Sequence, residues 1–307
     1  MINLVGNKRW LFLISEIFVV IGIFSLVVSQ IRLGTPLRLG IDFTGGTAMT
    51  LTFVPQVEQH QLRQALSENY SEAVIQRSGD DFLIRLREMS LQEREALIEA
   101  LETGLGSNVT VRDQDTVSPR VATDTARNAL IAVIIAAVAM LFYIAWAFRR
   151  MPKAFRWGTC AVICLIHDVF IIVGVFALLG LVAGVAIDAL FITGLLAVVG
   201  YSINNTVVVF DRIRENMSRR VRPDFGETVN DSIVQTLGRC LNTALTTFFV
   251  LLALLLFGGA TIYYFVLVLL LGVVIGSYSS TCIAGPLLVV WEKREWKVLL
   301  PFARKPA

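Results

Sequence analysis

Long apolar runs alternate with short charged segments along most of the chain. Six runs, at residues 11–29, 127–148, 158–182, 187–210, 241–257 and 262–290, contain very few charged side chains. An α-helix needs about 20 apolar residues to cross the hydrocarbon core of a bilayer. The pattern therefore predicts a polytopic α-helical membrane protein with six transmembrane helices. The composition agrees, because only 17% of the residues are charged, against about 25% in soluble domains.

The polar segment between the first two runs, about residues 31–125, has the mixed periodicity of a small α+β domain. Two strand-like stretches flank Gly45 and Gly46, a pair that favours a turn with positive φ. Ser90 and Glu93 have capping-box spacing at the start of a helix. The predicted elements are strands at 37–43 and 47–54, a helix at 57–69, strands at 73–77 and 82–87, a helix at 90–103 and a strand at 108–117. The order is interpreted as β-α-β-β-α-β, that of the ferredoxin-like split motif, and predicts a ferredoxin-like external domain.

Basic residues predict the orientation of the spans, because short cytoplasmic loops are rich in Lys and Arg. They cluster before the first span, between the second and third, after the fourth and after the sixth: Lys8, Arg9, Arg149, Arg150, Lys153, Arg156, Arg212, Arg214, Arg219, Arg220, Arg222, Lys293, Arg294, Lys297, Arg304 and Lys305. The opposite short connections, near Gly184 and Gly258–Gly259, carry no Lys or Arg. Both termini are therefore expected in the cytoplasm. The predicted divisions are 1–30 (N-terminus and first span), 31–125 (external domain), 126–291 (five spans, with an interfacial helix at 223–237) and 292–307 (cytoplasmic tail).

Polar residues inside the fourth run are the strongest functional signal. Tyr201, Ser202, Asn204, Asn205 and Thr206 fall within a predicted span. Polar side chains at bilayer depth are costly unless they face a partner helix or a polar path. The cluster therefore predicts either hydrogen bonding between helices or the lining of such a path.

Charged residues in or near other spans are further candidates. His167 and Asp168 lie in the middle of the third run, where a carboxylate must be paired, hydrated or protonated. Asp168 is interpreted as either a coupling residue or a structural hydrogen-bonding group. Asp211 and Arg239 mark the ends of the fourth and fifth runs, and either solvated helix ends or coupling groups would fit them. Small residues in the last run, Gly272, Gly276, Ser277, Ser279 and Ser280, predict close helix packing rather than chemistry.

These residues stand in motifs that resemble the SecF family of bacterial protein-export subunits. The motifs are GIDFTGGT at 40–47, LIHDVFI at 165–171, VVGYSINNTVVVFDRIREN at 198–216, TLGRCLNTALTT at 236–247 and LFGG at 256–259. The long central motif is specific, and the resemblance extends over essentially the whole chain. Asp42, Gly45 and Gly46 belong to the first motif.

The resemblance implies a function and a set of partners. SecF-type proteins belong to the resistance–nodulation–division superfamily, pair with SecD and work beside the SecYEG channel on the emerging unfolded preprotein. YajC and YidC are further candidate partners. The location implied is the bacterial inner membrane. The energy source implied is the proton gradient, without a cofactor, and the implied coupling candidates are Asn205, Asp168, Arg239 and Asp211.

Position 205 departs from the family pattern, which usually reads N-D-T where this chain has Asn204, Asn205 and Thr206. Asn has the shape of a protonated Asp but cannot release a proton. Three accounts remain open. Asn205 is an engineered substitution, or other carboxylates such as Asp168 carry the coupling, or the protein assembles without coupling protons.

Two other function classes compete with the export subunit. One is a half-transporter of the same superfamily that exports a small molecule or a lipid, and the other is a scaffold subunit without coupling. The chain contains no phosphate-binding GxxxxGK[ST] motif, so no ATPase activity of its own is expected. The cysteines have no zinc spacing, so no metal site is expected. Nucleic-acid binding is not expected either, because the positive-inside rule accounts for the basic residues.

Overall fold

The computed structural model describes residues 3–67, 69–70, 73–149, 151 and 153–296. Arg150 of the predicted basic loop and residues 297–307 of the predicted tail lie outside these ranges. The chain forms two compact units, one of residues 1–27, 133–175 and 190–307 and the other of residues 28–132 and 176–189. Each unit is described by itself.

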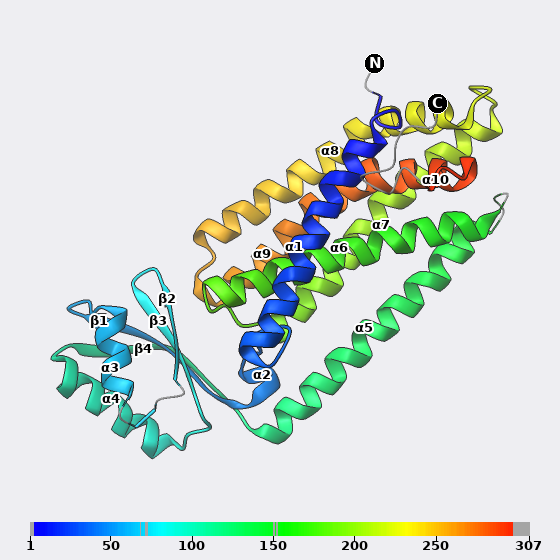
Figure 1. The fold of residues 1–307 in the computed structure, drawn as a ribbon. Coiled ribbons are helices and arrows are strands. Elements are labelled where there is room, and N and C mark those ends of the chain that lie inside the picture. The colour runs from blue at the N-terminus through cyan, green and yellow to red at the C-terminus, as the bar shows by residue number, and fades with distance from the viewer. Residues whose placement is uncertain (1–2, 68, 71–72, 150, 152, 297–307) are drawn as a thin grey trace. The chain divides into compact units, whose positions relative to one another are not determined.

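Six candidate membrane spans occur among the described residues, which confirms the predicted number. They are α1 (Lys8–Leu33), α5 (Pro119–Ala147), α6 (Ala154–Val182), α7 (Ala189–Ser218), α8 (Phe225–Phe257) and a last span that begins in α9 (Ala260–Tyr278). The last span continues through a π-helical turn, η1 (Ser279–Ala284), into α10 (Gly285–Lys293). In the first unit α8 and α9 pack side by side, as Figure 1 shows.

Helix α8 is continuous from Phe225 to Phe257. The predicted interfacial helix is therefore the first part of the same helix that forms the fifth span, and no break separates them. Asp224 supplies the N-cap, because its carboxylate accepts a hydrogen bond from the backbone N–H of Glu227. Gly238 does not interrupt the helix, since a single glycine costs only about 1 kcal/mol in a helix interior.

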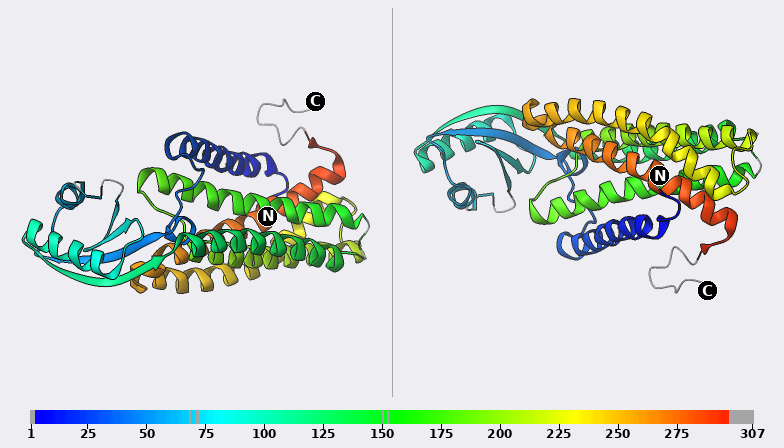
Figure 2. Two further views of the ribbon diagram at one scale, coloured as in Figure 1. Left: turned by 90° about the horizontal axis from the view of Figure 1, so that it is seen from below. Right: turned by 90° about the horizontal axis from the view of Figure 1, so that it is seen from above.

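Apolar side chains from several helices form the core of the first unit. Trp157 on α6 packs edge-on against Phe210 on α7, with ring centroids 5.3 Å apart. Phe148, just after α5, contacts both rings. Figure 2 shows α1 running beside α6, where Gly22 and Gly174 are in close contact.

The second unit contains a four-stranded antiparallel sheet. Its strands are β1 (Gly46–Val54), β2 (Val74–Ser78), β3 (Asp81–Leu86) and β4 (Asn108–Val117), in the spatial order β2-β3-β1-β4. Helices α3 (Gln59–Ser67) and α4 (Leu91–Leu105) pack through Leu62, Leu66, Leu97 and Leu101 against the buried face of the sheet. The chain order β1-α3-β2-β3-α4-β4 is the β-α-β-β-α-β order expected from the sequence.

One predicted strand is wrong. The stretch 37–43 does not join the sheet, because Ile41–Thr44 forms a short helix, α2, and Leu39 makes an isolated parallel bridge to Ile187. The backbone explains this departure, since Gly40 donates to the carbonyl of Ile187 over 2.7 Å and so points away from the sheet. Strand β1 begins only after the glycine pair.

Candidate functional site

The first unit encloses a buried polar cluster around Asp168 on α6. Asp168 is fully buried. Its Oδ2 accepts hydrogen bonds from the hydroxyls of Ser202 on α7 and Ser279 in η1, the latter over 2.7 Å. Its Oδ1 lies 2.9 Å from Nδ1 of His167. Three hydrogen-bonding groups therefore surround one carboxyl group, and two of them come from other helical segments.

The π-helical turn places its hydroxyls toward this cluster. Pro286 stands at the start of α10 and has no N–H to give to the carbonyl four residues earlier, at Cys282 within η1. Single π-helical turns occur often at functional sites. Here Ser279 reaches Asp168, and Ser280 lies 3.0 Å from the hydroxyl of Thr206 on α7. The packing role of these serines stays a prediction, and the structure adds that their buried hydroxyls form hydrogen bonds in this cluster.

The predicted packing role of the glycines in the last span is supported by their surroundings. A Cβ atom built on Gly276 would lie 3.1 Å from Cβ of Ser202, and one built on Gly272 would overlap Val198. The absence of side chains at both positions lets α9 approach α7 closely. That approach allows short serine side chains to bridge the two helices.

Asn205 is buried at the edge of the cluster, with 3% of its surface exposed. Its Nδ2 donates to the hydroxyl of Ser277 over 3.4 Å, a long hydrogen bond. The side chain faces the last span rather than the carboxyl of Asp168, which is hydrogen-bonded to the three groups named above. Asn205 and Asp168 are thus separate groups in one polar region.

Tyr201 and Asn204 differ from their neighbours. The hydroxyl of Tyr201 is buried and has no hydrogen-bond partner among the described residues. Asn204 is exposed on the surface of the unit. Of the five predicted polar residues of α7, the structure therefore brings Ser202, Asn205 and Thr206 into the interior and leaves Asn204 outside.

Asp211 and Arg239 come together at a different place. Both line a groove between α7 and α8, together with Glu215 and Gln235. Asp211 pairs with Arg214 one turn later on α7. Arg239 is exposed. The local ion pairs expected at the end of α7 are present, and neither residue contacts Asp168.

The glycine motif lies in the second unit and positions backbone rather than reacting groups. Gly45 and Gly46 have φ values of 76° and 128°, as the predicted turn requires. A Cβ atom on Gly46 would lie 2.4 Å from the carbonyl oxygen of Leu86. The carboxylate of Asp42 accepts a hydrogen bond from the backbone N–H of Ala189 over 2.7 Å. Asp42 therefore satisfies one of the free N–H groups at the start of α7.

Two members of the cluster could not be predicted from the sequence. Ser15 on α1 lies 3.0 Å from Nε2 of His167, and Ser279 is 111 residues from Asp168 along the chain. Serine is common in membrane helices, so neither residue stands out without its neighbours. No group of three or more metal-ligating side chains occurs among the described residues.

Two known protein families match segments of the sequence. Residues 97–294 match the family described as "Protein export membrane protein SecD/SecF, C-terminal", and residues 24–57 match the "SecD/SecF GG Motif". The chain belongs to the SecF family. It is an accessory subunit of the Sec protein-export machinery and a multi-pass membrane protein.

Individual SecF relatives extend over nearly the whole chain. The chain is 40% identical to the protein translocase subunit SecF of Thermobaculum terrenum over 96% of both chains. It is 38% identical to SecF of Anaerolinea thermophila over 100% of this chain and 99% of that one.

Solved structures of SecDF show the same fold. The crystal structure of SecDF from Thermus thermophilus matches with a TM-score of 0.84 and 34% identity over 95% of this chain and 39% of that chain. A SecDF structure in a super-membrane-facing form matches with a TM-score of 0.66 over 96% of this chain. This SecF-family chain therefore corresponds to one part of those longer proteins.

Proposed function

We propose that this SecF-family chain acts with a SecD-type partner beside the SecYEG channel, in the bacterial inner membrane, and uses the proton gradient to promote late preprotein export. The observation that carries the coupling proposal is the buried Asp168 carboxyl, held by hydroxyls from α7 and η1. Both termini are proposed to lie in the cytoplasm and residues 31–125 outside. The external domain would then be placed where the unfolded preprotein emerges. YajC and YidC remain candidate partners.

The charge on Asp168 can bias two helix arrangements. An ionised carboxylate in a dry interior is unfavourable by several kcal/mol unless hydrogen bonds or counter-charges compensate. Ser202 and Ser279 supply two such hydrogen bonds, so ionisation favours the arrangement that holds α7 and η1 close to α6. Protonation weakens that preference. A ligand shifts a conformational equilibrium by its differential affinity for the two states, and the proton would be that ligand.

Asn205 supports placing the coupling at Asp168. An amide does not titrate over the physiological pH range, so position 205 offers no exchangeable proton in this chain. Asp168 is the fully buried carboxyl among the described membrane helices. Moving one charge across the membrane potential is worth about 2.3 kcal/mol per 100 mV, which is enough to bias such an equilibrium.

Exposed polar side chains within the spans support a SecD-type partner. Asn204 on α7 and Asn242 on α8 are exposed on the surface of the first unit. Amides exposed to lipid are costly and are satisfied by hydrogen bonds to another helix. A relative from Thermus thermophilus, named protein translocase subunit SecDF, is 38% identical over 83% of this chain and only 34% of its own length.

The test is late-stage preprotein export in vesicles that contain the SecD partner, with and without a proton gradient. The chain is compared with Asp168→Asn and Asn205→Asp, and with Asp231→Asn as a control at a surface ion pair with Arg222. We expect Asp168→Asn to abolish the response to the gradient and Asp231→Asn to retain it. A full response in Asp168→Asn would place the coupling elsewhere.

The Asn205→Asp variant and the export measurements distinguish the remaining hypotheses, which are coupling at position 205, a scaffold role and a half-transporter. A larger response to the gradient in this variant would show that position 205 can also carry a coupling proton. Export that is independent of the proton gradient in the unsubstituted chain and in every variant would favour the scaffold role. Export of a small molecule or lipid that depends on Asp168 would favour the half-transporter.

A further inference from the structure

The two oxygens of the Asp168 carboxyl have different environments. Oδ2 accepts from two serine hydroxyls, Ser202 and Ser279, so both of its favourable acceptor directions are used. Oδ1 faces a single group, Nδ1 of His167, over 2.9 Å. An acidic proton on Asp168 therefore has its place on Oδ1, on the line toward the imidazole.

The imidazole connects that position with the surface of the unit. The side chain of His167 is 11% exposed, whereas that of Asp168 is 0% exposed. Nε2 of His167 lies 3.0 Å from the hydroxyl of Ser15 on α1. A proton bound for Asp168 can therefore pass through His167, because the carboxyl itself has no exposed surface.

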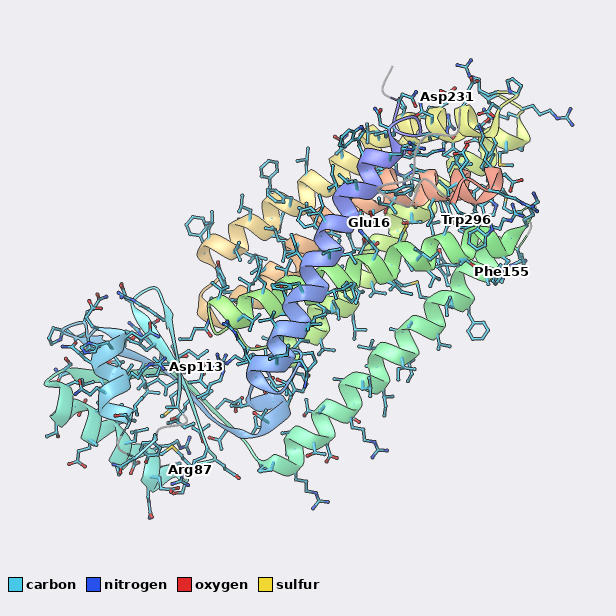
Figure 3. The ribbon with its side chains drawn as sticks, in the orientation of Figure 1. Glu16, Arg87, Asp113, Phe155, Asp231 and Trp296 are labelled. Carbon is cyan, nitrogen blue, oxygen red and sulfur yellow. The ribbon has the colours of Figure 1, made fainter. Side chains whose placement is uncertain are left out.

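The neighbouring ionisable groups do not replace His167 in this role. Cys164 lies on the preceding turn of α6 and is buried. Tyr278 on α9 donates its hydroxyl proton to the carbonyl of Leu11 over 2.7 Å and also contacts the Ser15 side chain, so it reaches His167 only through Ser15. Glu16 adjoins Ser15 on α1, where Figure 3 labels it. No lysine or arginine among the described residues forms a hydrogen bond or ion pair with Asp168, so His167 is the one potential cation bonded to it.

We propose that His167 and Asp168 form a single proton-binding pair, in which His167 takes up and releases the proton at Nε2 and Asp168 stores it at Oδ1. The pair begins with an ionised carboxylate and a neutral imidazole protonated at Nδ1. A proton from the medium forms an N–H bond at Nε2, the N–H bond at Nδ1 breaks, and an O–H bond forms at Oδ1. The imidazole is again neutral, as the other tautomer, and the pair has gained one proton.

Release reverses these steps. The O–H bond at Oδ1 breaks, Nδ1 regains its proton, and Nε2 returns one to the medium. No oxidant or further reactant takes part. Only the role of the pair in export rests on the proposed function. The proton-transfer steps themselves rest on the geometry of α1, α6, α7 and η1.

The chain offers an unusually clean measurement, because it contains only two histidines. The full chain, purified with its SecD partner, is labelled with ¹⁵N-histidine and followed by magnetic resonance across a pH series. His60 is exposed in the second unit and serves as an internal reference. In parallel, infrared difference spectra follow the carbonyl band of a protonated carboxyl group, which is assigned by its loss in Asp168→Asn.

We expect the His167 tautomer and the Asp168 carboxyl band to change together in the unsubstituted protein, because the uptake of one proton by the pair is a single macroscopic step that alters both groups. In His167→Gln the carboxyl band should shift its midpoint, and in Ser15→Ala the Nε2 signal alone should change. His60 should titrate identically in all forms. Separate midpoints for the imidazole and the carboxyl in the unsubstituted protein would overturn the pair.

The spectroscopic experiment tests the proton pair, and the export experiment tests the proposed function, so either can be refuted without the other. Coupled titration without any effect of Asp168→Asn on gradient-driven export would refute the proposed function and leave the proton pair standing. Loss of gradient-driven export in Asp168→Asn, with an imidazole that titrates as it does in the unsubstituted protein, would refute the pair and leave the function.

Discussion

At the scale of single residues, two tyrosine hydroxyls in the first unit have opposite environments. Tyr278 donates to the carbonyl of Leu11 over 2.7 Å. Tyr201 packs against a cluster of apolar residues from α8 and α9 that contains Leu251 and Val266, and its buried hydroxyl has no hydrogen-bond partner among the described residues. A buried polar group without a partner costs about 1–3 kcal/mol. Tyr201 therefore lowers the stability of the arrangement seen here.

Replacing Tyr201 should remove that cost. We expect Tyr201→Phe to raise the free energy of unfolding by about 1 kcal/mol, because the phenyl ring keeps the packing and the orphaned hydroxyl is lost. Tyr278→Phe is the matched control and should lower the same quantity by about 1 kcal/mol. Thermal unfolding of the full chain in detergent measures both. A loss of stability in Tyr201→Phe would contradict this reading of its environment.

At the scale of elements, the contact between α1 and α6 depends on two glycines. A Cβ atom on Gly174 would lie 2.4 Å from Cα of Gly22, a distance that no relaxed structure keeps. The contact also brings Ser15 of α1 to His167 of α6. Close approach of these two helices is therefore a requirement for the polar cluster.

We expect Gly174→Ala to destabilise the chain by about 1–3 kcal/mol, the usual cost of overpacking. Gly158→Ala, on the same helix, is the control, since the nearest atom to its Cβ position lies 3.7 Å away. Unfolding in detergent should show the loss for Gly174→Ala alone. Equal stability of the two variants would show that α1 and α6 can move apart without lowering the free energy of unfolding.

The capping box of α4 makes the second unit sensitive to acid. The backbone N–H of Ser90 donates to the Glu93 carboxylate, and with the Arg87 guanidinium it lowers the pKa of Glu93 from 4.5 to about 2. Figure 3 labels Arg87 in this unit. Because the pKa is lower in the folded state, this contribution is fully present above pH 4.5 and is lost as the pH falls toward about 2.

Glu93→Gln should therefore flatten the pH dependence of α4 stability between pH 4.5 and about 2, and should lower that stability near neutral pH, where the ionised carboxylate contributes fully. Amide hydrogen exchange of α4 in the full chain, corrected for intrinsic exchange rates, measures this. Glu95→Gln, at an exposed position on the same helix, should keep the original pH dependence. If both variants behave alike, the carboxylate of Glu93 does not hold the cap.

At the scale of the whole molecule, the distribution of charge predicts the orientation of the spans. The described connections on one predicted side carry Lys153, Arg156, Arg219 and Arg222, whereas the turn at Gly258–Gly259 carries no basic residue. The native cysteines are largely shielded, since Cys160, Cys164 and Cys240 are buried and Cys282 is partly buried. New cysteines at exposed positions can therefore report the topology.

We expect Glu99→Cys, in α4, to react with a membrane-impermeant maleimide in intact spheroplasts. Ser218→Cys, at the end of α7, should react only after the membrane is opened. The unsubstituted chain measures the background from the four native thiols. The reverse pattern of labelling would invert the proposed topology and with it the location of the second unit.

The features that depend on local signals could be predicted from the amino-acid sequence. Six long apolar runs predict six spans because only a helix satisfies its own backbone hydrogen bonds in lipid. The turn at Gly45–Gly46 and the capping box at Ser90–Glu93 are confirmed, since a few neighbouring residues define each of them. The resemblance of the polar motifs identified the family.

Only the tertiary structure decided which polar residues meet. Helical periodicity does not distinguish the lipid-facing side of a span from its protein-facing side, because both are apolar. The sequence therefore grouped Asn204 with Asn205, while the fold exposes Asn204 and buries Asn205. It also left Ser279 among packing residues, while the π-helical turn brings its hydroxyl to Asp168. Contacts between residues more than a hundred positions apart depend on how the helices pack, and the local sequence holds no signal for them.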